Sequence, residues 1–456
     1  MKPIKWAYLC CNMLCLVLLH ACGLQKNYTA PELPEYNLAT NTKTDSTSFA
    51  DTKWWDFFND KTLTKLITEG LQNNISLQNT VLALKQSQLQ LEIASADLYP
   101  TVNYGLSGES TKTSLSSKFS NTVIAAANVS YTLDLWGKIQ FQNEAALQSY
   151  LATETAYYQV QAALIAQIAT LYFTLRDTDT KIIVAENMAT SMTDYKNIIN
   201  ARYEGGFISK VDVNQIDIKI KDVEITRQTL LRARKQLENA ISLVLGSGPK
   251  QIPRGLTLQE QVFPSELPLG VSTQLLQRRP SILMAEQKLK AQLAVIGATE
   301  ALKYPNLTVA LNLGSQLTKP TMLFSELTGN LIGPIFNKNK ITNTINIEEE
   351  QYKQLENEYK QAYLIALQEV EDALIAIDTY KKEVSIRKEQ LHLSEEALNL
   401  AWVRYNEGVS SFLEFLNLQN DLFSAQLQAA ESYKLELQSI VKLYLALGGG
   451  WQNENN

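Results

Sequence analysis

The side chains that most often carry enzyme chemistry are scarce in this chain of 456 residues. It has two histidines and four cysteines, and all of these except His392 lie between Cys10 and Cys22. Ser-His-Asp and Cys-His catalysis need a histidine as the base, and zinc sites need several imidazoles or thiolates. The chain has too few histidines and cysteines for these chemistries, so we expect that it is not an enzyme and that it has no cofactor and no metal site.

One cysteine stands in a pattern that predicts modification. Lys2 and Lys5 precede the apolar run WAYLCCNMLCLVLL, which is shorter than a membrane span and typical of a secretory signal. The run ends in LHACG, where Leu19, Ala21 and Cys22 match the branched, small and acceptor positions of a bacterial lipoprotein signal. This predicts cleavage after residue 21 and acylation of Cys22 with a lipid such as palmitate. A plain cleaved signal is the alternative.

Composition and charge narrow the class of partner. The chain is 45% hydrophobic and 19% charged, with a formal net charge of −6 and a pI of about 5.3. An acidic balance gives no reason to expect nucleic acid as a partner. Loss of the signal would leave a single cysteine, which excludes a framework of intrachain disulfides.

The chain contains an internal duplication with proline at its boundaries. No proline occurs between Pro100 and Pro249, or after Pro334, and such tracts are where long helices can run. Three landmarks recur in the same order about 200 residues apart, which indicates a tandem repeat. They are a tyrosine-proline pair (Tyr99-Pro100, Tyr304-Pro305), an arginine-tyrosine pair before glycine (Arg202-Tyr203, Arg404-Tyr405) and a glycine after an apolar run (Gly246, Gly448).

Each half carries a predicted β-hairpin after a first helix, at 101–135 and at 306–336. Apolar residues alternate with polar or small ones along the predicted strands, which gives each strand one apolar face. The alternating residues are Val123, Ala125, Ala127, Val129, Tyr131 and Leu133 in the first half, and Leu307, Val309, Leu311 and Leu313 in the second. Strands of about ten residues have the length that a tilted strand needs to cross a bilayer core.

A long helix follows each hairpin, at 139–203 and at 337–405. A helix of about 65 residues is on the order of 100 Å long, and its heptad rows predict coiled-coil packing against shorter neighbours. The predicted division of the chain is a signal peptide 1–21, a tether and equatorial segment 22–62, a first repeat 63–246, an inter-repeat linker 247–270, a second repeat 271–447 and a tail 448–456. Turns at 204–210 and 406–411 separate the long helices from shorter helices at 211–246 and 412–447.

Four strands are too few to close a barrel. An open sheet in lipid would leave unpaired backbone groups at its edges, each costing several kcal/mol. The chain should therefore oligomerise to close the barrel, with the helices closing around the same axis. The sequence predicts a channel that starts in one membrane and reaches across a compartment.

At this point the sequence resembles the TolC-like outer-membrane channels, specifically the OprM-type lipoprotein branch that serves tripartite RND multidrug efflux pumps. Besides the repeated landmarks, the resemblance rests on WWDFFNDKTLTKLITEGLQNN (54–74), LDLWGK (133–138), LNLQNDLFSAQ (416–426) and LYLALGGGW (443–451). It implies a mostly α chain that forms a homotrimer, with a 12-stranded β-barrel in the outer membrane, a periplasmic α-helical barrel and a mixed equatorial domain. It further implies a passive exit duct for drugs or other small molecules, with a periplasmic adaptor and an inner-membrane RND-type transporter as partners.

The two arginine-tyrosine breaks then correspond to helix-to-helix turns at the periplasmic end. Gly205, Gly206 and Gly408 are expected to supply the positive φ angles that reverse a helix at low cost. The alternative to a role in gating is that these segments are only structural turns between helices.

The resemblance also implies a gate at these turns. It links an acid at Asp212 to Tyr405. Ser410 stands where the family has a third, basic partner, so the contact of that basic partner is absent or replaced here. It places Glu414 and Asn417 at the narrowest ring, where three carboxylates related by symmetry would favour cations.

Three rival functions stay open on the sequence alone. The same type of channel could serve type I protein secretion or metal efflux, because cargo choice lies in the pump. A different class of protein, a lipid-anchored periplasmic coiled-coil scaffold, would never cross the membrane, and its strands would be soluble hairpins.

Overall fold

The computed structural model describes residues 28–33, 52–112, 119–261, 278–318 and 321–451. The predicted signal, Cys22, most of the tether and part of the inter-repeat linker lie outside these residues. The chain divides into two compact units, and both repeats contribute to each. The strand unit comprises Met1–Leu33, Leu82–Thr155 and Ser281–Ala362, and the turn unit comprises Pro34–Val81, Ala156–Pro280 and Tyr363–Asn456.

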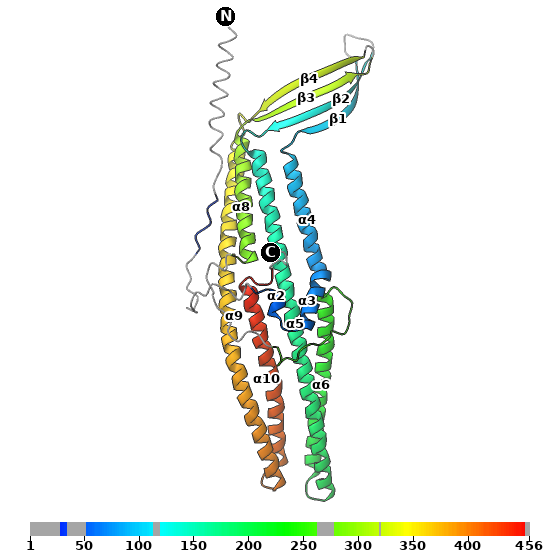
Figure 1. Ribbon diagram of the computed structural model, residues 1–456, viewed down its shortest axis with the longest axis vertical. Helices are drawn as coiled ribbons and strands as arrows, with labels where there is room; N and C mark the ends of the chain where they lie inside the picture. The colour runs from blue at the N-terminus through cyan, green and yellow to red at the C-terminus, as the bar shows by residue number, and fades with distance from the viewer. Residues whose placement is uncertain (1–27, 34–51, 113–118, 262–277, 319–320, 452–456) are drawn as a thin grey trace. The chain divides into compact units, whose positions relative to one another are not determined.

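The strand unit contains one four-stranded antiparallel sheet in the order β1-β2-β3-β4 (Figure 1). Its strands are β1 (Thr101–Thr111), β2 (Ser120–Leu133), β3 (Asn306–Gln316) and β4 (Met322–Ile332). Each repeat supplies one hairpin, and β2 pairs with β3 to join the two. The predicted four strands are confirmed.

One face of this sheet, the apolar face, is covered by aliphatic and aromatic side chains. Residues that pair across antiparallel strands lie on the same face, and neighbours along a strand lie on opposite faces. One transverse row on this face is entirely apolar: Val102, Val129, Leu311 and Leu327. Tyr104, Leu106 and Leu323 share the face and are highly exposed. The predicted alternation is confirmed, and it leaves a broad apolar surface uncovered within one copy of the chain.

The opposite face, the polar face, carries amides, hydroxyls and two carboxylates. Its most regular row is one position along from the apolar row, and it consists of Asn103, Asn128, Asn312 and Glu326. The outer backbone edges of β1 and β4 have no strand partner among the described residues. All of β1 is exposed as well. A single copy therefore presents an open sheet.

Aromatic side chains fix the point where strands meet helices. The indole Nε1 of Trp136 donates to the carbonyl oxygen of Pro305 at 2.8 Å, and the Trp136 ring stacks on Tyr304 at 4.7 Å. Gly137 follows with a φ of +73° and allows the chain to turn into the next helix. These contacts tie the exit of the first hairpin to the entry of the second.

The helices of the strand unit come from both repeats. They are the later part of α4 (Ile75–Ala96), the start of α5 (Lys138–Glu204), α8 (Pro280–Glu300) with the short 3-10 helix η3 (Ala301–Lys303), and the start of α9 (Lys340–Asn406). The long helix α9 begins at Lys340 because Lys338 and Asn339 adopt positive φ angles of 44° and 64°, which no helix accommodates. In the part of the chain that the structure describes, no helix combines the length and the apolarity that a membrane crossing requires.

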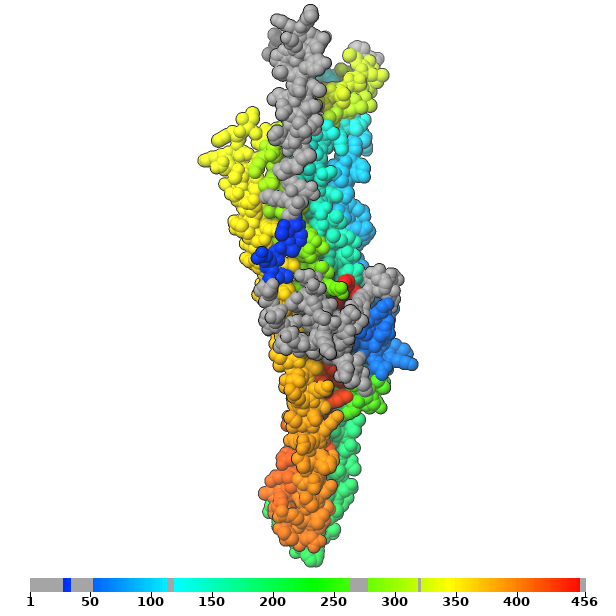
Figure 2. Space-filling model, turned by 60° about the vertical axis from the view of Figure 1, so that its left-hand side comes forward, coloured from blue at the N-terminus to red at the C-terminus, as the bar shows by residue number. Residues whose placement is uncertain are grey.

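The turn unit contains the remaining helices: α2 (Trp54–Phe57), α3 (Lys61–Asn73), α6 (Lys210–Val244), α10 (Phe412–Ala446) and the later parts of α5 and α9. In this unit α9 and α10 lie side by side, as both views show (Figures 1 and 2). Of the predicted heptad rows on α5, Ile165, Ile168, Tyr172 and Leu175 are at most 2% exposed, whereas Leu151 and Tyr158 are only partly buried. The part of this 67-residue helix that lies in the turn unit is thus held by packing.

Candidate functional site

The first helix reversal in the turn unit is a glycine-capped turn between α5 and α6. Gly206 has a φ of +79°, and the amide of Phe207 donates to the carbonyl of Arg202 at 2.9 Å, which is a Schellman arrangement. Gly205 has no positive φ, contrary to the expectation from the sequence. Its lack of a side chain instead makes room for the Phe207 ring, which would lie 2.7 Å from an added Cβ.

The second reversal, between α9 and α10, repeats the first. Gly408 has a φ of +72°, and the amide of Val409 donates to the carbonyl of Arg404 at 2.9 Å. Gly246 and Gly448, where α6 and α10 end, also have positive φ angles. In each repeat, the long helix and the shorter helix after it therefore both end at a glycine in the left-handed conformation. The duplication therefore extends to the backbone geometry of the turns.

Asp212 lies in the first turn of α6 and caps that helix. Its carboxylate accepts from the backbone amide and the hydroxyl of Ser209 at 3.3 and 3.4 Å, while the Ser209 hydroxyl accepts from the amide of Val211. This is a capping box, which satisfies amides that the helix leaves unpaired. The carboxylate is thus engaged within its own turn.

Tyr405 is 7% exposed at the end of α9. Its ring packs against Phe412 at 5.3 Å and Trp402 at 5.8 Å. Among the described residues its hydroxyl oxygen has no hydrogen-bond partner. The structure therefore does not join Tyr405 to Asp212 by a hydrogen bond.

A residue that sequence reasoning did not single out connects the two reversals. The guanidinium of Arg202, at the end of α5, lies over the Tyr405 ring at 4.9 Å and donates from Nη2 to Oδ1 of Asn406 at 2.8 Å. One side chain thus holds the end of α5 to the end of α9. The repeated arginine-tyrosine pair marks this residue in the sequence, but the repeat by itself indicates only the duplication.

The equivalent arginine of the second repeat has a different partner. Arg404 Nη1 lies 3.7 Å from Oε1 of Glu414, and both side chains are about half exposed. The backbone amide of Glu414 donates a hydrogen bond to the hydroxyl oxygen of Ser411, which caps α10. Asn417 is exposed one turn further along α10. The hydroxyl of Ser410 has no hydrogen-bond partner in the described chain, so it takes no part in a lock within one copy.

An aromatic cluster lies beneath the turns and fixes their geometry. Phe415 is fully buried, and its ring lies 4.7 Å from that of Tyr195 and 4.9 Å from that of Trp402. Tyr195 and Trp402 are themselves 4.6 Å apart. These rings come from α5, α9 and α10, and each such pair contributes about 0.5–1.5 kcal/mol beyond the area it buries. The packing of these rings therefore holds the helix ends next to the two reversals in place.

A second polar centre of the turn unit, which we call the collar, joins residues 52–60 and 247–261 to the helices. Asp60 is 2% exposed and caps α3, since Oδ1 accepts from the amides of Thr62 and Leu63 at 2.8 and 3.3 Å. Its other oxygen, Oδ2, accepts three further hydrogen bonds at 2.8–3.0 Å. The donors are the Tyr172 hydroxyl, the Leu256 amide and the Gln261 side-chain amide.

The phenol of Tyr172 is a donor here for a clear electrostatic reason. Burial raises the pKa of Tyr172 well above its usual value, and the nearby Asp60 carboxylate raises it further. The phenol therefore stays protonated and donates a hydrogen bond to Asp60. Its oxygen also accepts a hydrogen bond from the amide of Gly255 at 2.8 Å. One buried carboxylate thus orders three distant parts of the sequence.

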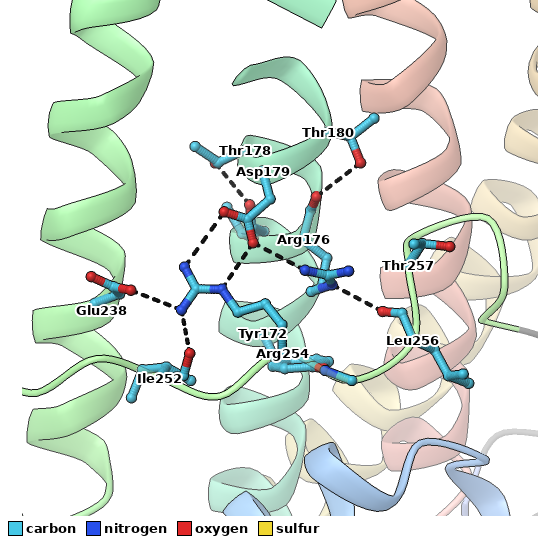
Figure 3. A network of polar contacts seen from close by, with 12 residues as sticks. Tyr172, Arg176, Thr178, Asp179, Thr180, Glu238, Ile252, Arg254, Leu256 and Thr257 are labelled. Carbon is cyan, nitrogen blue, oxygen red and sulfur yellow. Dashed lines mark hydrogen bonds and ion pairs between the residues drawn. The ribbon is translucent and has the colours of Figure 1, made fainter. Parts of the chain in front are cut away.

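Arg254 makes the other collar contact, between two helices of the turn unit. Figure 3 shows its guanidinium between Glu238 of α6 and Asp179 of α5, at 2.7 and 3.0 Å. Glu238 is 4% exposed. Burial raises the pKa of Glu238, but hydrogen bonds from Arg254 and Lys235 lower it by more, so the net pKa is below its usual value. The inter-repeat segment is thereby clamped to the helices it follows.

Two strands and a reversed pair of helices per repeat, in a duplicated chain, form the architecture of a TolC-like outer-membrane channel. The family model described as outer membrane efflux protein matches residues 66–247 and 271–449. The chain therefore belongs to the outer membrane efflux protein family.

Relatives match along nearly the whole chain. The sequence is 30% identical to the antibiotic efflux pump outer membrane protein ArpC of Pseudomonas putida, over 96% of this chain and 94% of that protein. A crystal structure of CusC matches with a TM-score of 0.88 at 26% identity, over 94% and 100% of the two chains. The open state of the Neisseria gonorrhoeae MtrE outer membrane channel matches with a TM-score of 0.85 at 26% identity, over 94% and 99%.

Proposed function

We propose that this chain is the outer-membrane exit duct of a tripartite efflux pump. It is a passive channel that carries drugs or other small molecules delivered by an inner-membrane RND-type transporter through a periplasmic adaptor. The observation that carries the proposal is the sheet: one face is apolar and exposed, the other is polar, and both edges are open. A sheet of this kind suits a membrane barrel that several copies close together.

A homotrimer is the assembly that we propose. Three copies of a four-stranded sheet give twelve strands, and pairing of β4 with the β1 of the next copy removes every open edge. Helix surfaces of the turn unit support self-association, because exposed apolar residues recur every seventh position. They are Val211, Ile218 and Ile225 on α6, and Ile386, Leu393 and Leu400 on α9.

The scaffold alternative differs in where the apolar face lies. A lipid-anchored coiled-coil scaffold in the periplasm would leave Tyr104, Leu323 and Leu327, which are 96%, 86% and 73% exposed, facing water. An uncovered patch of such residues is the mark of an interaction surface or a membrane contact. Two rival functions keep the same type of channel but change its cargo: secretion would carry proteins, and metal efflux would carry metal ions. Relatives of the chain include an antibiotic efflux pump outer membrane protein and a cation efflux system protein.

The test is assembly and conductance of the full chain. We expect the protein in outer-membrane fractions as a trimer that dissociates on heating, and we expect it to conduct ions in planar bilayers. In the same fractions, wild-type protein should take up acyl label and Cys22→Ser should not, if Cys22 anchors it. Recovery only as a salt-extractable peripheral monomer without conductance would support the scaffold and refute the channel.

We further propose that the two helix reversals form the periplasmic entrance of the channel. Gly206 and Gly408 shape the turns, and Glu414 and Asn417 face the narrowest ring. The Asp212 and Tyr405 contact implied by the family resemblance belongs, on this proposal, to a gate state in which Asp212 leaves its cap. The placement of Glu414 in the first turn of α10, half exposed beside Arg404, supports the assignment.

Glu414→Ala is expected to lower the preference for cations. Removal of three carboxylates from a ring leaves the Arg404 guanidiniums uncompensated, so the local potential becomes more positive. The measurement is the reversal potential in a salt gradient across a planar bilayer. Glu204→Ala, an exposed acid at the end of α5, is the matched control. An equal reversal potential in wild type and Glu414→Ala would remove Glu414 from the constriction.

A further inference from the structure

We propose that the row Asn103, Asn128, Asn312 and Glu326 lines the lumen of the barrel and binds hydrated cations there. We call it the amide–carboxylate row. The inference rests on the proposed trimeric channel, and it adds a cation-selective point within the membrane, separate from the entrance at the helix turns. Nothing in the gate assignment above requires it.

The row is continuous across the whole sheet. Asn103 pairs with Asn128, Asn128 with Asn312, and Asn312 with Glu326, so all four side chains leave the same face at the same level. Nδ2 of Asn128 donates to Oδ1 of Asn312 at 2.5 Å, and Nδ2 of Asn312 donates to Oε2 of Glu326 at 3.4 Å. The hydrogen bonds thus run in one direction and end on the carboxylate.

The charges of the strands show which face meets water. Within β1 to β4, all of whose residues are described, the charged residues are Glu109 and Glu326, and both lie on the polar face. A charged side chain on the lipid face of a barrel costs free energy that increases toward the bilayer centre. Leu327 and Ser325, the chain neighbours of Glu326, lie on the apolar face. A carboxylate at this level is therefore accommodated only in an aqueous lumen.

The geometry of the row favours cations over anions. Glu326 is exposed, so its carboxylate can meet a hydrated ion, and the amide oxygens of the row are further ligands of the type that hard cations accept. On the same face, two positions along β4, the ring of Phe324 lies over Gly314, where an added Cβ would be 2.4 Å from it. The ring fits because Gly314 has no side chain, and it adds an aromatic surface that attracts cations. Three copies would place three such groups around one lumen.

The charge of Glu326 can be removed without removing its shape. Glu326→Gln keeps an oxygen that can accept from Asn312, so the row should persist while the negative charge is lost. We expect the permeability ratio of K⁺ to Cl⁻ to fall by about twofold or more in planar bilayers. Conductance should fall more in 0.1 M KCl than in 1 M KCl, because the Debye length is about 10 Å at the lower concentration and about 3 Å at the higher. Glu326→Asp keeps the charge and should keep the permeability ratio.

A second measurement tests the placement itself and does not depend on ion flow. In intact outer membranes, Glu326→Cys should react with a charged, water-soluble maleimide, whereas Leu327→Cys on the apolar face should not. Labelling of Leu327→Cys in preference to Glu326→Cys would overturn the inference.

The outcomes separate the row from the channel. A trimer that conducts normally, with a K⁺ to Cl⁻ ratio and a low-salt conductance unchanged in Glu326→Gln, overturns the row and leaves the channel standing. Wild-type protein that forms no conducting trimer overturns the proposed function, and the inference falls with it.

Discussion

Asp60→Ala is expected to destabilise the collar on the order of 5 kcal/mol, one of the largest effects of any single substitution in this chain. The substitution removes an acceptor of five hydrogen bonds at a site that is 2% exposed. Each buried donor left without a partner costs about 1–3 kcal/mol, and the lost cap of α3 costs about 1 kcal/mol more. The measurement is the urea midpoint of the helical circular dichroism signal of the detergent-solubilised full chain.

Asp60→Asn separates the two roles of the carboxylate. With its oxygen at the cap, an asparagine still accepts from Thr62 and Leu63, but its NH₂ group then faces three donors. We therefore expect Asp60→Asn to cost nearly as much as Asp60→Ala. Asp56→Ala, an exposed acid four residues earlier, is the control and should change stability by less than about 0.5 kcal/mol. A near-neutral Asp60→Asn would show that the cap alone matters.

Local pattern was enough to predict the strands and the reversals. The alternation along 123–133 and 307–313 fixed which side chains share a face, because a strand has a period of two whatever surrounds it. Glycines after arginine-tyrosine pairs predicted the turns, because a left-handed cap favours glycine in any context. Gly205 was the exception, since one of two adjacent glycines takes the positive φ and sequence does not say which.

The polar centres could not be predicted, because their partners lie far apart along the chain. Asp60 meets Tyr172 and Leu256, and Arg254 meets Asp179, pairs that only the packed helices bring together. Asp212 shows the opposite limit. The family resemblance implied a distant partner for its carboxylate, yet a serine three residues before an acid is itself the pattern of a capping box, which the structure shows.

The two repeats also diverge where their sequences look alike. Arg202 and Arg404 occupy equivalent positions, each two residues before an acid or amide and ahead of the turn glycine. Arg202 reaches across to α9, whereas Arg404 stays within its own reversal. This asymmetry makes Arg202 the side chain that ties one reversal to the other, and we propose that it replaces the basic partner that the family resemblance implies at the position of Ser410.

Arg202→Ala is accordingly expected to raise the open probability of the entrance by about tenfold per copy. The substitution removes a charge-assisted hydrogen bond to Asn406 and a cation–π contact with Tyr405. Allowing for partial exposure, these contribute about 1.4 kcal/mol, which corresponds to a factor of ten. The measurement is single-channel recording of the trimer in planar bilayers.

Arg404→Ala is the matched control, because it removes the same side chain from the equivalent turn but breaks only an exposed pair, worth about 0–1 kcal/mol. Arg202→Lys should give an intermediate open probability, since a lysine keeps the charge but not the planar guanidinium. The Arg202 contacts would be irrelevant to gating if both alanine variants opened the channel equally. They would be equally irrelevant if an intact Arg202→Ala trimer recorded like the wild type. A selective effect of Arg202 would mean that opening requires the two reversals of each copy to part from one another, and that the first repeat restrains the second.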